Sequence, residues 1–76
     1  INFEQLSTRE RMTEILERMR NETFIEFYSL FSSEEGRMGV GVTFLAVLEL
    51  LKDSLIEIVQ SEEFAPIHIR GIEEVH

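Results

Sequence analysis

The 76-residue sequence contains no cysteine, no tryptophan and only one proline. Without cysteine, the chain can form neither a disulfide nor a thiolate metal site, which is typical of a cytoplasmic protein. Basic residues are also scarce: 7 lysines and arginines stand against 15 aspartates and glutamates, for a net charge of −8. A surface of this charge repels phosphate groups, so we expect no direct binding to nucleic acid.

Long hydrophobic runs are absent as well. The longest strongly apolar run, residues 40–48, is too short to span a bilayer, and no basic stretch followed by an apolar one predicts a signal peptide. We therefore expect no contact with a membrane. A chain of this length is expected to form one domain over residues 1–76. Because it begins at Ile1 without an initiator methionine, we expect it to be a fragment of a longer protein.

The first half of the chain carries helical patterns. Ser7 and Glu10 have the spacing of a capping box and predict a helix over residues 8–20, which stops near Asn21. Residues 23–24 suggest a short strand, and the helical spacing of the aromatic residues favours a second helix over residues 25–31. That aromatic cluster is interpreted as core, with the hydroxyl of Tyr28 at the surface. It comprises Phe24, Phe27, Tyr28, Phe31 and Phe44.

The second half begins with a polar, glycine-containing loop over residues 32–39 and a third helix over residues 40–52. The helix is apolar on two sides, so it is either covered on both or exposes a contact patch. Its expected inward stripe is Val40, Phe44, Val47, Leu48 and Leu51, and its second apolar patch is Val42, Leu45 and Ala46.

Two strands complete the pattern. Residues 55–59 are rich in β-branched side chains, and residues 67–70 alternate apolar and polar side chains. The last strand is expected to be a free edge that pairs with another sheet or is blunted by Arg70 and the acidic tail. The predicted fold class is therefore α+β: a small winged-helix domain of three helices and a β-hairpin, with a short strand between helices 1 and 2.

No constellation of residues predicts catalysis, a cofactor or a metal ion. The glycines of residues 36–41 match no phosphate-binding pattern, because no strand precedes them and no Lys-Ser/Thr pair follows. His68 and His76 have no partner at metal-ligand spacing. The serines at positions 32, 33 and 61 have no visible base. We expect a protein that is not an enzyme and binds a protein partner.

Residues 42–52, a β-rich segment ending at Val59-Gln60, and then Phe64 and Ile67 closely resemble the C-terminal region of the segregation and condensation protein A (ScpA) family, the bacterial kleisins. The resemblance covers roughly residues 40–69 and joins a helix signature to a strand signature at a fixed distance. The earlier part of the chain fits this family in pattern only.

The resemblance implies a C-terminal winged-helix domain that docks on the ATPase head of an SMC protein. It also implies a role in ring closure and in chromosome condensation and segregation, in the cytoplasm at the nucleoid. Members of this family bind ScpB through a central region, which we expect to lie outside these residues. The partner-binding residues expected around the hairpin are Leu55, Ile58, Val59, Phe64, Ile67 and Ile69.

Two other interpretations remain open. A winged-helix DNA-binding or transcription-regulator module would need a basic third helix or wing, whereas the wing here contains Glu62 and Glu63. A self-associating module would use the hairpin edge or the patch around Val42 and Leu45.

Overall fold

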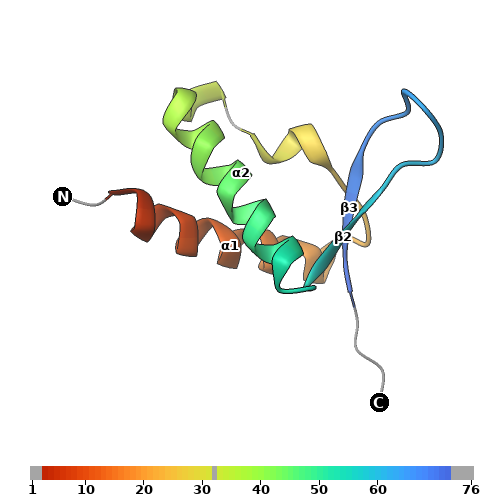
Figure 1. The fold of residues 1–76 in the computed structure, drawn as a ribbon, viewed down its shortest axis with the longest axis horizontal. Helices are drawn as coiled ribbons and strands as arrows, with labels where there is room; N and C mark the ends of the chain where they lie inside the picture. Colours follow the sequence, from red (N-terminus) through yellow and green to blue (C-terminus); the bar gives the residue numbers. More distant parts are fainter. Residues whose placement is uncertain (1–2, 32, 73–76) are drawn as a thin grey trace, which may run out of the picture.

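The computed structural model describes residues 3–31 and 33–72 as a small α+β domain (Figure 1). Within these residues lie two α-helices, three strands and two short 3₁₀ turns, so the predicted α+β class is confirmed. Their bounds are α1 Phe3–Asn21, β1 Ile25–Glu26, 3₁₀ turns Phe27–Leu30 and Ser33–Glu35, α2 Gly36–Lys52, β2 Ile56–Val59 and β3 His68–Gly71.

The sheet is antiparallel with the order β1-β3-β2, so the last strand lies in the centre. Ile69 of β3 lies opposite Ile25 on one side and opposite Ile58 on the other. The prediction that the last strand is a free edge is therefore wrong, because β1 pairs with His68 and Ile69 on its second side. The hairpin of β2 and β3 itself is confirmed, with bounds shifted by one residue.

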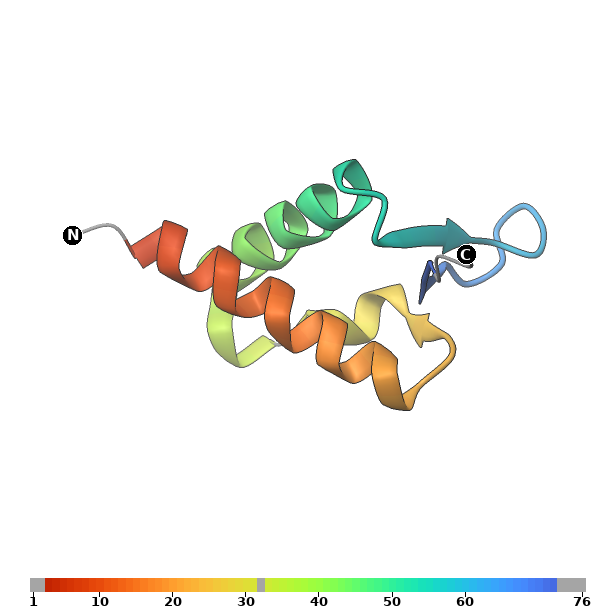
Figure 2. The ribbon, with the colours of Figure 1, turned by 90° about the horizontal axis from the view of Figure 1, so that it is seen from below.

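The core forms where the C-terminal ends of both helices meet the sheet. Figure 2 shows α1 and α2 side by side, with the strands at one end of the pair. One cluster of buried apolar side chains joins all these elements, and apolar residues of α1 flank it. Its members are Ile15 of α1, Ala46, Val47 and Leu50 of α2, and Ile25, Ile56 and Ile69 of the sheet.

Helix α1 ends at Asn21, as predicted, but it begins before the predicted start. The backbone of Ser7 already lies inside the helix, so the predicted capping box at Ser7 and Glu10 is wrong. The apolar stripe of α1 is confirmed: Ile15 is buried, and Met12, Leu16 and Met19 pack against the core. The stripe identified the buried face correctly, while a local motif misplaced the first turn.

The predicted second helix is only a 3₁₀ turn, Phe27–Leu30. The Glu26 carboxylate accepts a hydrogen bond of 2.8 Å from the backbone N–H of Tyr28 and so caps this turn. Because Ile25 and Glu26 are extended in the sheet, the turn starts only at Phe27, and the strand predicted at residues 23–24 lies two residues later. Of the aromatic cluster, Phe27 packs against the core, whereas Phe24, Tyr28 and Phe44 are exposed.

Helix α2 begins at Gly36, four residues before the predicted start, and ends at Lys52 as predicted. Gly36 has φ +67°, a left-handed conformation that glycine adopts without steric cost. The segment predicted as a loop over residues 32–39 therefore contains a 3₁₀ turn and the first turn of α2, while residue 32 lies outside the described residues.

Candidate partner-binding surface

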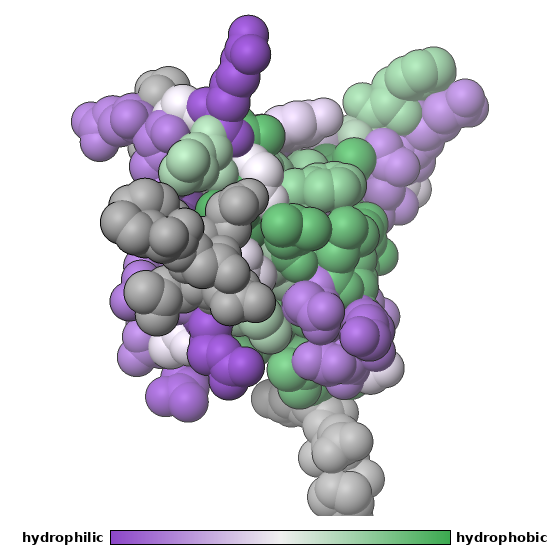
Figure 3. Space-filling view, turned by 60° about the vertical axis from the view of Figure 1, so that its left-hand side comes forward, coloured by the Kyte–Doolittle hydropathy of each residue, from purple (hydrophilic) through white to green (hydrophobic). Residues whose placement is uncertain are grey.

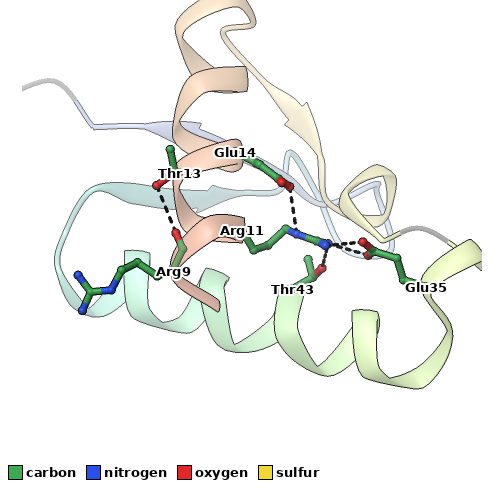
Figure 4. A network of polar contacts seen from close by, with 6 residues as sticks. All are labelled: Arg9, Arg11, Thr13, Glu14, Glu35 and Thr43. Carbon is green, nitrogen blue, oxygen red and sulfur yellow. Dashed lines mark hydrogen bonds and ion pairs between the residues drawn. The ribbon is translucent and has the colours of Figure 1, made fainter. Parts of the chain in front are cut away.

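A polar network fixes α2 against α1. Arg11 reaches from α1 toward the beginning of α2, where Glu35 and Thr43 face it (Figure 4). Its two terminal nitrogens donate to the two carboxylate oxygens of Glu35 at 2.8 and 2.5 Å, and Nη1 also donates to Thr43 Oγ1 at 2.8 Å. Arg11 Nε lies 3.2 Å from a carboxylate oxygen of Glu14. A bidentate pair of this kind fixes orientation as well as distance.

The same contacts alter the proton affinities of both partners. The hydrogen bond from Arg11 lowers the pKa of Glu35 below its ordinary value, and the charge of Arg11 acts in the same direction. In turn, the hydrogen bond to Glu35 raises the pKa of Arg11, against an opposing effect of burial. Both shifts favour the charged pair at neutral pH.

The buried face of α2 contains three small residues beside Val42, Val47 and Leu50. Gly39, Thr43 and Ala46 follow helical spacing and are all buried. At Gly39 the approach is so close that an added Cβ would lie 2.2 Å from the Cβ of Glu35. Glu35 directly precedes α2, so the absence of a side chain at Gly39 leaves room for the Glu35 side chain that holds Arg11.

The opposite half of α2 is apolar and lies at the surface. Phe44 is 50% exposed, and its neighbours on this half are exposed to a similar degree. No charged residue occurs in the sequence between Arg37 and Glu49. Figure 3 shows apolar side chains gathered in one area over α2, with hydrophilic ones below it. We call this surface the uncharged face of α2; it comprises Met38, Val40, Phe44, Leu45 and Leu48.

The predicted inward stripe of this helix is therefore largely wrong. Val40, Phe44 and Leu48 are exposed, and only Val47 of the predicted stripe is fully buried. Val42 and Ala46, assigned to the second patch, lie in the interior instead. Of the two expected alternatives, the helix exposes an apolar face, but Val40, Phe44 and Leu48 lie on the exposed face instead of the buried one. The signal that distinguishes them is the row of small residues, which interpretation by hydrophobicity alone passes over.

The predicted hairpin residues divide into three groups. Leu55, Ile58 and Phe64 are exposed, so they are available to a partner. Val59 and Ile67 are partly buried, and Val59 lines a hollow of about 290 Å³. Ile69 is completely buried and belongs to the core. The structure therefore does not bring the six residues together on one surface.

Side chains that usually bind metal ions do not gather at one place in the described part of the chain. Among the described residues, no group of three or more histidine, aspartate or glutamate side chains could hold a metal ion. His68 packs edge-to-face against Phe24, with ring centroids 6.4 Å apart, and His76 lies outside the described residues.

In the part of the chain that the structure describes, no helix has the length and hydrophobicity needed to cross a membrane.

Comparison with known proteins shows to which family the chain belongs. Residues 1–72 match the family model of the segregation and condensation protein ScpA. The chain belongs to the ScpA family. Segregation and condensation protein A of Coxiella burnetii is 60% identical over 68 residues, which cover 90% of this chain and 26% of that protein. The protein of the same name from Xylella fastidiosa is 46% identical over all of this chain and 25% of its own length.

The match extends well beyond the segment on which the sequence resemblance rests. The protein of that name from Bacillus subtilis is 45% identical over 67 residues, 87% of this chain and 26% of its own length. The chain thus spans about a quarter of the length of these curated ScpA relatives. Membership of the ScpA family is consequently established for this chain.

Proposed function

We propose that this domain docks on the ATPase head of an SMC protein through the uncharged face of α2. The observation that carries the proposal is the contrast between this face and the rest of the chain. A chain of net charge −8 leaves five large apolar side chains exposed on one helix, with no charge between Arg37 and Glu49. An apolar patch with a polar border is the usual composition of a protein-binding surface.

Through this contact the domain would attach a ScpA-family subunit to the ATPase and contribute to ring closure. The longer protein would bind ScpB through a region outside these residues and would act in the cytoplasm at the nucleoid. The domain itself would serve as a binding module without catalytic residues, placed toward the C-terminal end of that protein. Family membership supports the role in chromosome segregation and condensation.

Only some of the predicted hairpin residues remain in the proposed interface. Leu55 and Ile58 are exposed and remain candidates for the border of the interface, whereas Ile69 is buried and can act only by supporting the fold. The centre of the proposed interface therefore moves from the hairpin to Phe44 and Leu48 of α2. Aromatic and large aliphatic side chains at the centre of an interface usually contribute most of the binding energy.

The decisive experiment is calorimetric titration of the 76-residue chain into the cognate SMC head, with duplex DNA as a parallel ligand. We expect saturable one-to-one binding to the head. A Phe44→Glu variant should bind at least about 30-fold more weakly, as expected for loss of a central contact. Thr13→Glu, on the exposed side of α1, adds the same charge and should bind like the unmodified chain.

Two outcomes would contradict this function. Binding of the unmodified chain to DNA with no response to the head would favour the DNA-binding alternative. Concentration-dependent dimerisation in sedimentation, abolished by Phe44→Glu, together with no binding to the head, would favour self-association. Circular dichroism of each variant would show whether the fold is retained.

A further inference from the structure

The loop between β2 and β3 presents one aromatic side chain to solvent. Phe64 is 93% exposed, more than any other large apolar residue described. Figure 1 shows this loop projecting beyond the body of the domain, at the opposite end of the hairpin from the C-terminus. Along the chain, β2 lies between α2, with its uncharged face, and the loop that carries Phe64. The exposure of Phe64 is therefore a feature independent of that face.

The backbone at Phe64 is in a conformation that bulky residues rarely adopt. Its φ is +69°, in the left-handed region that favours glycine and tolerates asparagine. Such conformations persist where the surroundings enforce them, and they are concentrated at functional sites. Here the sequence keeps phenylalanine at a position where glycine would cost less, although the side chain contributes almost nothing to the core.

Hydrogen bonds hold the loop in this shape. The side chain of Gln60 donates from Nε2 to the carbonyl oxygen of Ala65 at 2.8 Å. The backbone N–H of Ala65 donates to the carbonyl oxygen of Glu62 at 3.0 Å. Both bonds end on the residue that follows Phe64, so they fix the direction in which its side chain leaves the loop. A loop backbone ordered before binding loses less conformational entropy when it binds.

We propose that Phe64 is a second anchor for the SMC head, inserting into an apolar pocket whose rim carries lysine or arginine. The proposal rests on the proposed function, because it names another contact with the same partner. Glu62 and Glu63, both exposed, precede the aromatic ring and would face that basic rim. An aromatic anchor beside charged rim residues is a frequent arrangement at protein interfaces.

The acidic neighbours argue against other occupants. An exposed aromatic ring can stack on a nucleic-acid base or enter a membrane interface, but both surfaces favour basic residues beside the ring. Glu62 and Glu63 would meet phosphate groups in either case and repel them. A basic-rimmed apolar pocket on a protein satisfies both the ring and the two carboxylates.

Replacing Phe64 with glycine separates binding from stability. Phe64→Gly removes the ring and relieves the left-handed strain, so its Tm should be unchanged or higher by up to about 5 °C. Its affinity for the SMC head should nevertheless fall about 30-fold, as expected for an interface anchor. Phe64→Leu keeps an apolar side chain and should lose less affinity than Phe64→Gly. Calorimetric titration and thermal unfolding would be run on the same preparations.

The charged rim has a separate test in association kinetics. Reversing both acids, in the double variant Glu62→Lys and Glu63→Lys, should slow association with the head at low salt by about tenfold. The double variant Glu10→Lys and Glu17→Lys makes the same change in net charge on the exposed side of α1. This control should change the association rate far less.

The possible results separate the two proposals. Equal affinity of Phe64→Gly and the unmodified chain would overturn the anchor while leaving docking through α2 intact. Equal effects of the two charge reversals would overturn the basic rim. Failure of the unmodified chain to bind the head would refute the proposed function, and the anchor with it.

Discussion

The space available for one Cβ atom differs between two glycines at the beginning of α2. Gly39 and Gly41 are two residues apart on the same helix, yet their surroundings differ completely. An added Cβ at Gly39 would overlap the Cβ of Glu35, whereas an added Cβ at Gly41 would meet nothing within 4 Å. The side chain of Glu35 in turn holds Arg11, so crowding at Gly39 would disturb the contact between the two helices.

The same substitution should therefore have opposite effects at these two glycines. Gly39→Ala should destabilise the domain by about 1–3 kcal/mol, because overpacking outweighs the better helix propensity of alanine. Gly41→Ala should stabilise it by about 0.5–1 kcal/mol, since only the propensity term remains. Urea unfolding of both variants would measure the free energies. Equal effects at the two positions would show that the close contact with Glu35 is absent.

The ion pair of Arg11 and Glu35 predicts a dependence on pH. Because Arg11 lowers the pKa of Glu35 in the folded state, the pair contributes stability above the ordinary glutamate pKa, 4.5, and that contribution is lost as pH falls through the lowered value. Between pH 7 and pH 3 the unmodified chain should lose more unfolding free energy than Glu35→Gln. Glu17→Gln, at a position with no ion pair among the described residues, should lose as much as the unmodified chain.

At the scale of elements, β3 holds the sheet together. It pairs with β1 through Ile25 and Glu26 and with β2 along its whole length. Ile58 and Ile69 are opposite one another in this register, but Ile58 is 51% exposed and Ile69 is completely buried. Two residues of the same type, paired across one ladder, thus contribute very differently to the core.

Truncation of this pair should show the difference directly. Ile69→Ala should cost about 2–5 kcal/mol of unfolding free energy, as for other fully buried isoleucines. Ile58→Ala should cost less than about 1.5 kcal/mol, because half of its surface is already in water. Chemical denaturation would measure both values. A cost at position 58 equal to that at position 69 would contradict the assigned position of β2 at an edge of the sheet.

Sequence patterns predicted the elements with the clearest periodicity. They failed where two opposite orientations of an element fit the hydrophobic pattern equally well. The stripe of α1 and the β2–β3 hairpin could be predicted because only one face or one alternation is apolar. Helix α2 is apolar on both halves, so hydrophobicity gives no preference between Phe44 and Ala46 for the interior. What distinguishes the buried half is that it carries the small residues Gly39, Thr43 and Ala46.

The position of β3 could not be predicted for a different reason. A strand of two residues, Ile25–Glu26, has no alternation that a sequence pattern can detect, yet it pairs with His68 and Ile69 on the second side of β3. The wrong position of β3 also affected the predicted set of partner-binding residues. Phe64 and Ile58 are exposed as a contact surface requires, but Ile69 had to be core once its strand lay in the centre.

At the scale of the whole molecule, charge limits the choice of partner. The net charge is −8, and the helix that corresponds to a recognition helix in DNA-binding domains has no basic residue between Arg37 and Lys52. Binding to DNA depends mainly on neutralising phosphates with basic side chains. The same acidic surface suits approach to a protein with a basic region.

We expect no saturable binding of this chain to duplex DNA at about 150 mM salt, because its charge opposes the main term in DNA affinity. Fluorescence anisotropy with labelled duplexes of several sequences would test this. A matched measurement near 50 mM salt should also show none, since lower salt strengthens repulsion as well as attraction. Affinity that rises as salt is lowered would contradict this expectation.

The central position of β3 has a consequence for the order in which the domain can form. During synthesis α1, β1, α2 and β2 all leave the ribosome before β3, which lies between the two earlier strands. Until residues 68–71 emerge, Ile25 and Ile56 have no strand between them, and no sheet can close. The pairing of β1 with β3 is distant along the chain and slows folding, because a long loop must be ordered before it forms. The nascent chain therefore presents an incomplete apolar core until β3 is made.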